Sequence, residues 1–338
     1  MLKPVHKWTR RALLAPLAAL SLGLAASAQA ETVTIGVQSM FAPWKSAIAE
    51  KEFEKATGWD IQWRNFDSGG DVMLAMASGD VQIGVAGSSP IAAAVSRGVD
   101  VELFWILDNI ADAEALVVRN GSGIDAPQDL AGKTLAVPFV STTHFHTLFA
   151  LQQFGLNGKV KVVNLQPSDI PAAWERGDID AAFIWDPALG KLKQNGKVLL
   201  TSGTLTNWGK ATFEGLVVDK TFAADNAEAM TAFTKVLQSS TADYVNAPGT
   251  WTVDSPKVAS VAAQSGAKPA DVPPVLALYQ FPLATEQASA SWLGGGKDGG
   301  AARALAATSA FLKEQKKVPA VLADYSRVIN PRFVEAAR

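Results

Sequence analysis

The sequence predicts an α/β protein of two lobes, each with a mostly parallel sheet flanked by helices. Three observations predict this class. Short β-branched runs alternate with amphipathic stretches, the alternation restarts after Glu114, and 338 residues is a length typical of about two compact units. A hydrophobic content of 48% is enough to fill a large core.

The predicted elements follow one another in a regular order. Strands are expected at 32–37, 62–66, 81–85, 101–107, 116–119, 134–138, 161–165, 181–185 and 215–218. Helices are expected at 44–57, 71–78, 90–97, 143–154 and 170–176, and throughout most of the chain after residue 222. The polar stretch 195–210 is expected to be a connection, and the glycine-rich stretch 294–300 a flexible loop.

The first 30 residues have the pattern of a secretory signal peptide. A basic head formed by Lys3, Lys7, Arg10 and Arg11 precedes an apolar run at 12–26, and small residues surround a cleavage site between Ala30 and Glu31. The alternative is a membrane anchor, but the run is shorter than the roughly 20 residues that a span requires. We therefore expect export to the periplasm.

The composition disfavours several classes of protein. Four of the 30 basic residues lie in the leader, which leaves residues 31–338 with an excess of acidic side chains, so neither nucleic acid nor an anionic membrane is an expected partner. The absence of cysteine excludes thiol catalysis, thiolate metal sites and a lipid anchor on cysteine. We expect a freely diffusing monomer without a cofactor.

The histidines also argue against a metal site and against catalysis. After residue 30 the sequence contains only His144 and His146, which are two positions apart and do not share a helix face. A metal site on this pair is therefore not expected, and no motif of a hydrolase is found, so the chain is not expected to be an enzyme.

An internal echo relates the two halves of the chain. Residues 75–90 read AMASGDVQIGVAGSSP and residues 173–187 read AWERGDIDAAFIWDP. Each contains a helix end, Gly-Asp, a strand and a loop with proline. One interpretation is a chance similarity, since helix–turn–strand segments often share such residues. The other is that two equivalent lobes contribute the same loop to a shared cleft.

Ligands of open α/β sheets bind beyond the carboxyl ends of the strands. The candidate substrate-binding residues near these ends are Gln38, Gly87, Ser88, Ser89, Asp108, Ser141, Thr142, Thr143, His144, Trp185, Asp186 and Glu214. Glu214 differs from the others because it lies at the start of its strand.

Two hydroxyl-rich loops precede predicted helices. In the first, Ser89 is the expected N-cap and Pro90 the first helical residue, so that free N–H groups and the helix dipole favour an anion. The second, 141–143, offers three consecutive hydroxyls to a sulfonate, sulfate or carboxylate. Ordinary caps without a ligand are the alternative.

Three carboxylates lie beside apolar runs, where burial is costly unless they are paired. Asp108, Asp186 and Glu214 are either members of structural ion pairs or partners of a ligand ammonium, and Trp185 either packs in the core or against that ammonium. Anion-binding loops opposite carboxylates indicate a zwitterionic solute.

The chain resembles the solute-binding proteins of ABC importers for taurine, alkanesulfonates and nitrate. The similar segments follow the family's order over nearly the whole chain after the leader: 66–69, 77–84, 87–90, 114–118, 136–144, 163–167, 172–180, 311–315 and 317–320. The resemblance implies a type II periplasmic binding fold with a two-segment hinge, near 114–117 and 214–217. Its lobes would be 31–115 with 217–338, and 116–216.

The resemblance also implies a function. It identifies the loops 88–89 and 141–143 as the sulfonate site and Glu214 as the amine partner, with taurine or a close aminated sulfonate as solute, delivered to an ABC permease and its ATPase subunit. Three residues depart from the family pattern: Glu214 replaces an aspartate, Asp186 a small apolar residue, and Asp108 is more acidic than expected. The alternatives are a binder of an unaminated sulfonate, nitrate or a pyrimidine precursor, and an enzyme on the same fold.

Overall fold

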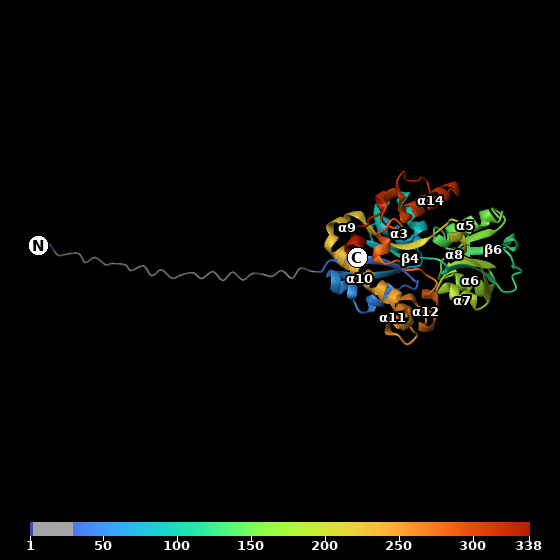
Figure 1. Cartoon of the computed structure of the whole chain (residues 1–338), viewed down its shortest axis with the longest axis horizontal. Coiled ribbons are helices and arrows are strands. Elements are labelled where there is room, and N and C mark those ends of the chain that lie inside the picture. The colour runs from blue at the N-terminus through green and yellow to red at the C-terminus, as the bar shows by residue number, and fades with distance from the viewer. Residues whose placement is uncertain (3–29) are drawn as a thin grey trace. The chain divides into compact units, whose positions relative to one another are not determined.

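Two five-stranded sheets organise residues 31–338 (Figure 1). The computed structural model describes residues 1–2 and 30–338, so nearly all of the predicted signal peptide lies outside the described residues. The first sheet has the order β2-β1-β3-β10-β4, with β1 at Thr32–Gln38, β2 at Asp60–Phe66, β3 at Ile83–Gly87, β4 at Val101–Asn109 and β10 at Phe213–Asp219. The second has the order β7-β6-β8-β5-β9, with β5 at Glu114–Arg119, β6 at Thr134–Val137, β7 at Lys161–Asn164, β8 at Ala181–Trp185 and β9 at Gly196–Thr201.

The two sheets correspond strand for strand. β10 pairs antiparallel with β3 and β4, and β5 pairs antiparallel with β8 and β9, whereas the remaining ladders are parallel. Each sheet is therefore mixed, with one strand running against the others. The echoing segments contain β3 and β8, the central strands of their sheets, which confirms that they are equivalent parts of two similar lobes.

The chain crosses between the sheets twice. It leaves the first sheet after Asn109 and enters the second at Glu114, and it returns between Asn207 and Phe213. The boundaries expected from the sequence, 115/116 and 216/217, fall a few residues later, inside β5 and β10. β5 and β10 are the strands that the chain enters after its two crossings, and they are also the strands that run antiparallel to their neighbours.

The helices cover both sheets. In the first lobe they are α1 (Ser46–Ala49), α2 (Glu52–Thr57), α3 (Gly69–Ala77), α4 (Ser88–Val95), α9 (Lys220–Asp225), α10 (Ala227–Asn246), α11 (Pro256–Ser265), α12 (Val272–Leu276), α13 (Ala284–Gln287), α14 (Gly300–Glu314) and α15 (Arg332–Ala336). In the second they are α5 (Thr142–Gln153), α6 (Ile170–Arg176), α7 (Ala188–Lys193) and α8 (Ser202–Asn207).

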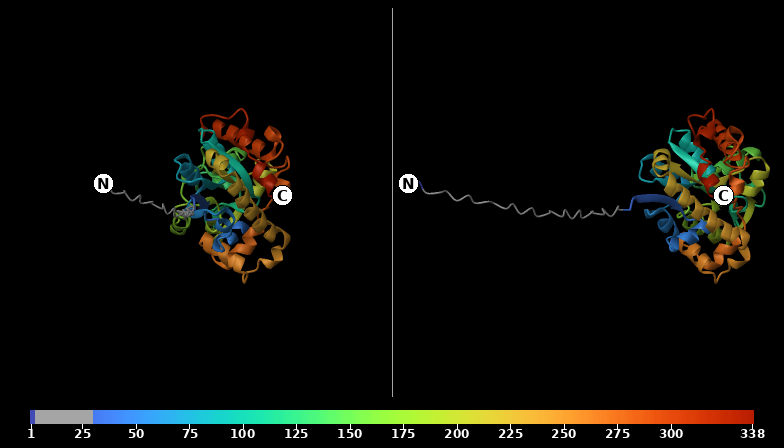
Figure 2. Two further views of the ribbon diagram at one scale, coloured as in Figure 1. Left: turned by 90° about the vertical axis from the view of Figure 1, so that its left-hand side faces the viewer. Right: turned by 60° about the vertical axis from the view of Figure 1, so that its left-hand side comes forward.

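The C-terminal third of the chain completes the first lobe. α14 packs on α4 and α11 on α1, so the orange and red segments lie against the blue and teal ones (Figure 2). In the core of this lobe, Phe233 of α10 contacts Phe53 of α2 with ring centroids 4.6 Å apart. Large apolar side chains on one face of α10 thus join segments that are distant in sequence.

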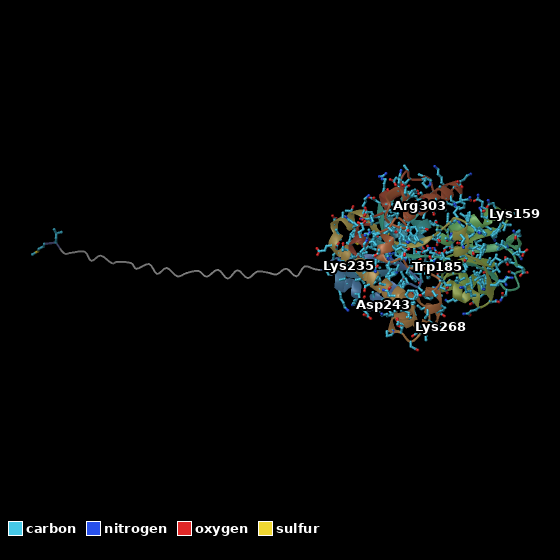
Figure 3. All side chains as sticks on the ribbon, viewed as in Figure 1. Lys159, Trp185, Lys235, Asp243, Lys268 and Arg303 are labelled. Carbon is cyan, nitrogen blue, oxygen red and sulfur yellow. The ribbon has the colours of Figure 1, made fainter. Side chains whose placement is uncertain are left out.

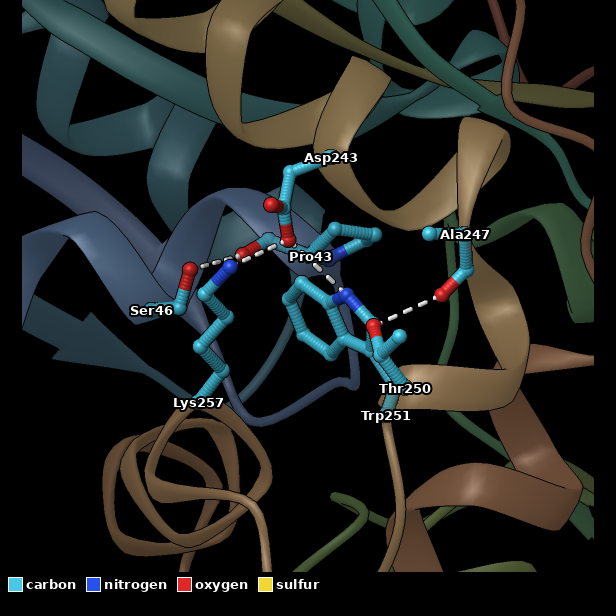
Figure 4. A network of polar contacts seen from close by, with 7 residues as sticks. All are labelled: Pro43, Ser46, Asp243, Ala247, Thr250, Trp251 and Lys257. Carbon is cyan, nitrogen blue, oxygen red and sulfur yellow. Dashed lines mark hydrogen bonds and ion pairs between the residues drawn. The ribbon is translucent and has the colours of Figure 1, made fainter.

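One polar network fastens α11 to α10 (Figure 4). Asp243 accepts hydrogen bonds from the indole N–H of Trp251 at 3.0 Å and from Nζ of Lys257 at 2.6 Å. The Lys257 ammonium also lies 5.8 Å from the Trp251 ring centroid. Because Asp243 is half exposed to solvent, this ion pair orients the helices more than it stabilises the fold.

Two predicted elements differ from the structure. The single helix expected at 44–57 is broken at Lys51, whose φ of 54° is left-handed and separates α1 from α2. The polar connection expected at 195–210 contains β9 and α8. β9 is an edge strand whose short apolar run, 198–200, stands among polar residues and glycine and includes an exposed Val198, so the stretch has the overall composition of a connection.

The glycine-rich stretch 294–300 is not an open loop. The N–H of Gly300 donates to the carbonyl of Ala290 at 2.9 Å, and a Cβ on Gly300 would stand 1.8 Å from the carbonyl oxygen of Ser291. Gly294 is similarly close to the carbonyl of Ala288. Glycine is required here because two backbone segments pack directly on each other, which corrects the predicted flexible loop.

Two properties hold for residues 1–2 and 30–338, the part of the chain that the structure describes. None of their helices has the length and apolar character to cross a bilayer. Among the same residues, no group of three or more histidine, aspartate or glutamate side chains is arranged to hold a metal ion.

Candidate functional site

The two lobes meet where β3 runs into α4 and where α5 begins. A Cβ built on Gly87 would stand 2.6 Å from Cγ2 of Thr142 and 3.1 Å from Oε1 of Glu214. Gly87 and Glu214 are also register partners in the first sheet. The sequence-predicted residues Gly87, Thr142 and Glu214 therefore lie together, and two helix N-termini converge on one point of the cleft.

Asp108 adds a second carboxylate to this point. It is the register partner of Glu214 on the neighbouring strand, and its side chain is fully buried. Neither carboxylate oxygen of Asp108, nor Oε2 of Glu214, has a hydrogen-bond partner among residues 30–338. Burial without a partner is costly for a charged oxygen, so a cation or a proton bound to this pair would stabilise it.

The pKa values of Glu214 and Asp108 reflect this unfavourable burial of charge. Burial raises the pKa of Glu214 well above its ordinary value, and the neighbouring charges of Asp108 and Glu114 raise it further. The pKa of Asp108 is raised for the same reasons, by burial first and then by the charge of Glu114.

Glu114, the first residue of β5, is a third buried carboxylate. Its Oε1 accepts a hydrogen bond from Thr142, and its Oε2 accepts one from Ser202 at 2.9 Å. Burial raises the pKa of Glu114 to about 7 in spite of these two bonds. From the sequence, Glu114 was expected at a crossing between the lobes and not among the site residues.

A small cavity lies between the carboxylates. It measures about 10 Å³ and is lined by Met40, Ile110, Glu114, Trp185, Glu214 and Tyr279. This is room for about one water molecule, so a larger solute requires the lobes to part. Trp185 lies in the middle of the molecule (Figure 3), and its register partner is Glu114.

Direct contacts hold the lobes together on either side of this cavity. Ser89 Oγ donates to the carbonyl of Val140 at 3.3 Å, and Gln166 Nε2 donates to Asp71 Oδ2 at 3.3 Å. Phe311 of α14 packs edge-on against Phe145 of α5, with centroids 5.3 Å apart. The lobes are thus closed upon each other.

The starts of the two helices differ from their expected form. α4 begins at Ser88, with Gly87 as its N-cap, so Ser89 is a first-turn residue and not the cap. α5 has the expected hydroxyl cap, because Ser141 Oγ accepts from the N–H of His144 at 3.0 Å. Ser141 Oγ also contacts Thr143 Oγ1 at 2.8 Å, so these two hydroxyls serve the turn itself.

Three predicted site residues make hydrogen bonds within their own lobe. Gln38 donates to the carbonyl of Val85 at 3.1 Å. His144 accepts from the N–H of Val140 at 3.1 Å and stacks on Phe139. Asp186 accepts from the N–H of Gly190 at 2.9 Å and lines a separate groove between α7 and α12.

The remaining residues of the cavity were not predicted from the sequence. Glu114 heads an apolar run, as Asp108 ends one, so the signal that found Asp108 applied equally to Glu114. Tyr279 is buried, and burial first, then the nearby charges of the carboxylates, raise its pKa well above the ordinary value. No local pattern marks Tyr279, because it reaches the site through the fold of α12.

The mixed sheets, the double crossing and the two facing lobes define the two-lobed fold of periplasmic binding proteins. Residues 47–251 match the family described as NMT1/THI5 like, and the chain belongs to this family. The chain is 42% identical over 328 residues to the taurine-binding periplasmic protein of Escherichia coli (strain K12), covering 97% of this chain and 99% of that protein.

Solved structures share the fold. The alkanesulfonate-binding protein SsuA from Xanthomonas axonopodis pv. citri, bound to MOPS, superposes with a TM-score of 0.71 at 21% identity, over 89% of this chain and 99% of that chain. The desulfurization enzyme DSZB superposes with a TM-score of 0.59 at 15% identity, over 91% and 99% of the two chains. The fold therefore occurs in binding proteins and in an enzyme.

Proposed function

We propose that this chain is the periplasmic solute-binding protein of an ABC importer and that it captures taurine or a close aminated sulfonate. The observation that carries the proposal is the buried pair Asp108 and Glu214, with three carboxylate oxygens that no hydrogen bond reaches, beside two converging helix N-termini. An ammonium beside the pair would form charge-assisted bonds worth about 1.5–3 kcal/mol each.

The helix N-termini beside this pair suit the anionic sulfonate of the solute. The first turns of α4, at Ser88 and Ser89, and of α5, at Thr142 and Thr143, belong to opposite lobes, and the positive ends of these two helices would favour an anion between them. A sulfonate bound between them and an ammonium at Asp108 and Glu214 would together satisfy both halves of a zwitterion.

Binding at this place is coupled to closure. The lobes, 31–109 with 213–338 and 114–207, would part at the two crossings, admit the solute and close on it. The closed form would then dock, as a monomer, on a membrane permease whose ATPase subunit drives uptake. No step of this cycle requires chemistry by the chain, which is why we assign it as a binding protein and not as an enzyme.

Calorimetry on the chain beginning at Glu31 tests the proposal. Taurine is expected to bind at least about 10-fold more tightly than butanesulfonate, because only taurine supplies an ammonium to the carboxylates. Equal or tighter binding of butanesulfonate would overturn the aminated-solute assignment.

A pair of matched variants locates the amine. Glu214→Gln removes a carboxylate of the cavity, and we expect it to weaken taurine far more than butanesulfonate. Asp186→Asn removes a buried carboxylate of the neighbouring groove and serves as the control, with little effect on either solute. Equal losses of both solutes in Glu214→Gln would remove Glu214 from the amine site.

The enzyme on the same fold remains the second candidate, and turnover decides it. Incubation of the purified chain with taurine and with aromatic sulfinates should return each compound unchanged, as judged by sulfite release. Release of sulfite in proportion to the protein would contradict the binding-protein assignment.

A further inference from the structure

A continuous chain of hydrogen bonds runs behind Glu114, away from the cavity. Ser202 Oγ lies 2.9 Å from Glu114 Oε2 and 2.8 Å from Nδ1 of His146. Nε2 of His146 lies 2.7 Å from the carbonyl oxygen of Lys210. Glu114, Ser202 and His146 come from β5, α8 and α5, and all three are buried.

The number of protons in this chain follows from its geometry. A carbonyl oxygen only accepts, so Nε2 of His146 carries a hydrogen and Nδ1 of a neutral imidazole is left as an acceptor. An ionised Glu114 is also an acceptor, and Ser202 has one hydrogen to give to two acceptors. The three bonds can all form only if the chain holds one proton more than an ionised Glu114 and a neutral His146 carry together.

The extra proton has two possible positions. In the first, Glu114 is a neutral acid that donates to Ser202, and Ser202 donates to Nδ1 of His146. In the second, His146 is an imidazolium that donates to Ser202, and Ser202 donates to the Glu114 carboxylate. No heavy atom has to move between them, because every donor and acceptor stays in place.

The groups around Glu114 and His146 determine which of the two holds the extra proton. Glu114 lines the same cavity as Glu214 and lies near Asp108, and a further negative charge beside these carboxylates is unfavourable. Around His146 lie the rings of Phe145 and Phe183, and the ammonium of Lys210, whose carbonyl accepts from His146, lies over Phe149 and Phe311. Burial raises the pKa of Glu114 to about 7 and lowers that of His146 to about 4, so the proton resides on Glu114 when no cation is near.

We propose that Glu114, Ser202 and His146 form a proton relay that adjusts the charge of the solute site to the solute. When an ammonium settles beside Asp108 and Glu214, the O–H bond of Glu114 breaks, its proton forms a bond to Ser202 Oγ, and the original Ser202 proton passes to Nδ1 of His146. Glu114 becomes a carboxylate facing the ammonium, and His146 becomes an imidazolium behind it. No proton from Glu114 leaves the protein.

The relay makes Ser202 and His146 positioning residues for specificity, and it rests on the proposed binding of an aminated sulfonate. An aminated solute receives an additional carboxylate from Glu114, whereas an unaminated sulfonate leaves Glu114 a neutral acid. The buried site thereby avoids holding three negative charges when it is empty.

The histidine ring reports the relay directly. Residues 31–338 contain only His144 and His146, so ¹⁵N-histidine labelling gives two rings, and a His144→Gln variant assigns them. At pH 6.5 we expect His146 to be the neutral Nε2–H tautomer in the free protein and with saturating butanesulfonate, and an imidazolium with saturating taurine.

Two variants at one position complete the test. Ser202→Ala interrupts the relay and is expected to leave His146 neutral in the presence of taurine, with weaker taurine binding. Ser202→Thr keeps the hydroxyl and is expected to restore the imidazolium. A neutral His146 in the wild-type protein while calorimetry shows taurine saturating the site would overturn the relay alone. A complete absence of taurine binding would overturn the proposed function and the relay with it.

Discussion

Gly87 and Thr142 belong to different lobes, yet a Cβ on Gly87 would stand 2.6 Å from Cγ2 of Thr142. Real side chains do not approach so closely, so the closed arrangement of the lobes depends on the missing side chain at position 87. The backbone of Gly87 is extended, with φ of −69°, which shows that the requirement is space and not a left-handed conformation.

Gly87→Ala is therefore expected to prevent full closure. The added methyl costs about 1–3 kcal/mol in the closed form and little in an open one, so taurine affinity should fall at least about 10-fold. Calorimetry measures the affinity, and small-angle scattering with saturating taurine measures the closure.

Gly70→Ala is the matched control for this prediction. Gly70 also faces the second lobe, but its added Cβ would lie 3.7 Å from Cβ of Val140, an ordinary contact. Wild-type affinity in Gly70→Ala together with wild-type affinity in Gly87→Ala would show that closure does not bring these helix starts together.

The unpartnered carboxylate of Glu214 gives stability an unusual pH dependence. Its pKa is raised in the folded protein, so the folded state binds more protons than the unfolded state above the ordinary pKa of 4.5. This contribution to stability falls as pH rises from there toward the folded pKa. Glu214→Gln should therefore stabilise the solute-free protein at pH 8.5 relative to pH 5, by on the order of 1 kcal/mol or more.

Urea unfolding of both proteins at the two pH values measures this difference. The comparison with the wild type isolates Glu214, because the buried histidines and lysine contribute to both proteins. A variant that gains no more at pH 8.5 than at pH 5 would show that Glu214 is solvated or paired in the folded chain.

The contribution of Lys45 to stability should change with pH in the opposite direction. It is buried, its Nζ donates to the carbonyl of Gln38 at 2.6 Å and contacts Ser265 Oγ at 3.3 Å, and burial lowers its pKa from 10.5 to about 7. The unfolded state binds more protons between these values, so this contribution to stability rises with pH from about 7 to 10.5.

Lys45→Met removes the cost of burying the charge and fills a similar volume. We expect it to raise the free energy of unfolding by about 1–3 kcal/mol more at pH 6 than at pH 10, measured by urea unfolding. Loss of the bond to Gln38 lowers both values equally. A gain at pH 10 that matched the gain at pH 6 would contradict a depressed pKa at Lys45.

The sequence predicted the strands of both sheets, three of the four edge strands included, and missed only β9 among the strands of residues 30–338. β8 was predicted at its observed bounds because its five residues are apolar and buried. β9 was missed because its short apolar run, 198–200, lies within a stretch, 195–210, that is otherwise rich in polar residues and glycine. Local propensity also could not locate the left-handed Lys51 that divides α1 from α2.

The candidate site was predictable in part for a related reason. Position at a strand end identified Gly87, Asp108 and Trp185, because the topology of α/β sheets brings such ends together. Whether a side chain at that edge faces the cleft depends on local turns. Asp186 caps the start of α7 and His144 folds back on Val140, and neither choice is encoded in a pattern that sequence spacing reveals.

The contact of Phe311 with α5 leads to the last prediction. Phe311 is in the last turn of α14, in the first lobe, and its ring lies edge-on to Phe145 at 5.3 Å and to Phe149 at 6.2 Å, in the second lobe. Leu312 belongs to the same apolar cluster. A contact made across the lobes favours the closed form by its own free energy, and a ligand that requires closure benefits by the same amount.

Phe311→Ala should accordingly lower taurine affinity by about 10-fold and also lower the free energy of unfolding by about 3 kcal/mol. Val334→Ala separates the two effects, because Val334 is buried within the first lobe alone and its truncation should cost stability without changing affinity. Calorimetry and urea unfolding on both variants provide the four values. Unchanged affinity in Phe311→Ala would mean that α14 stays on α5 when the lobes open, so that Phe311 belongs to the hinge and not to the closing surface.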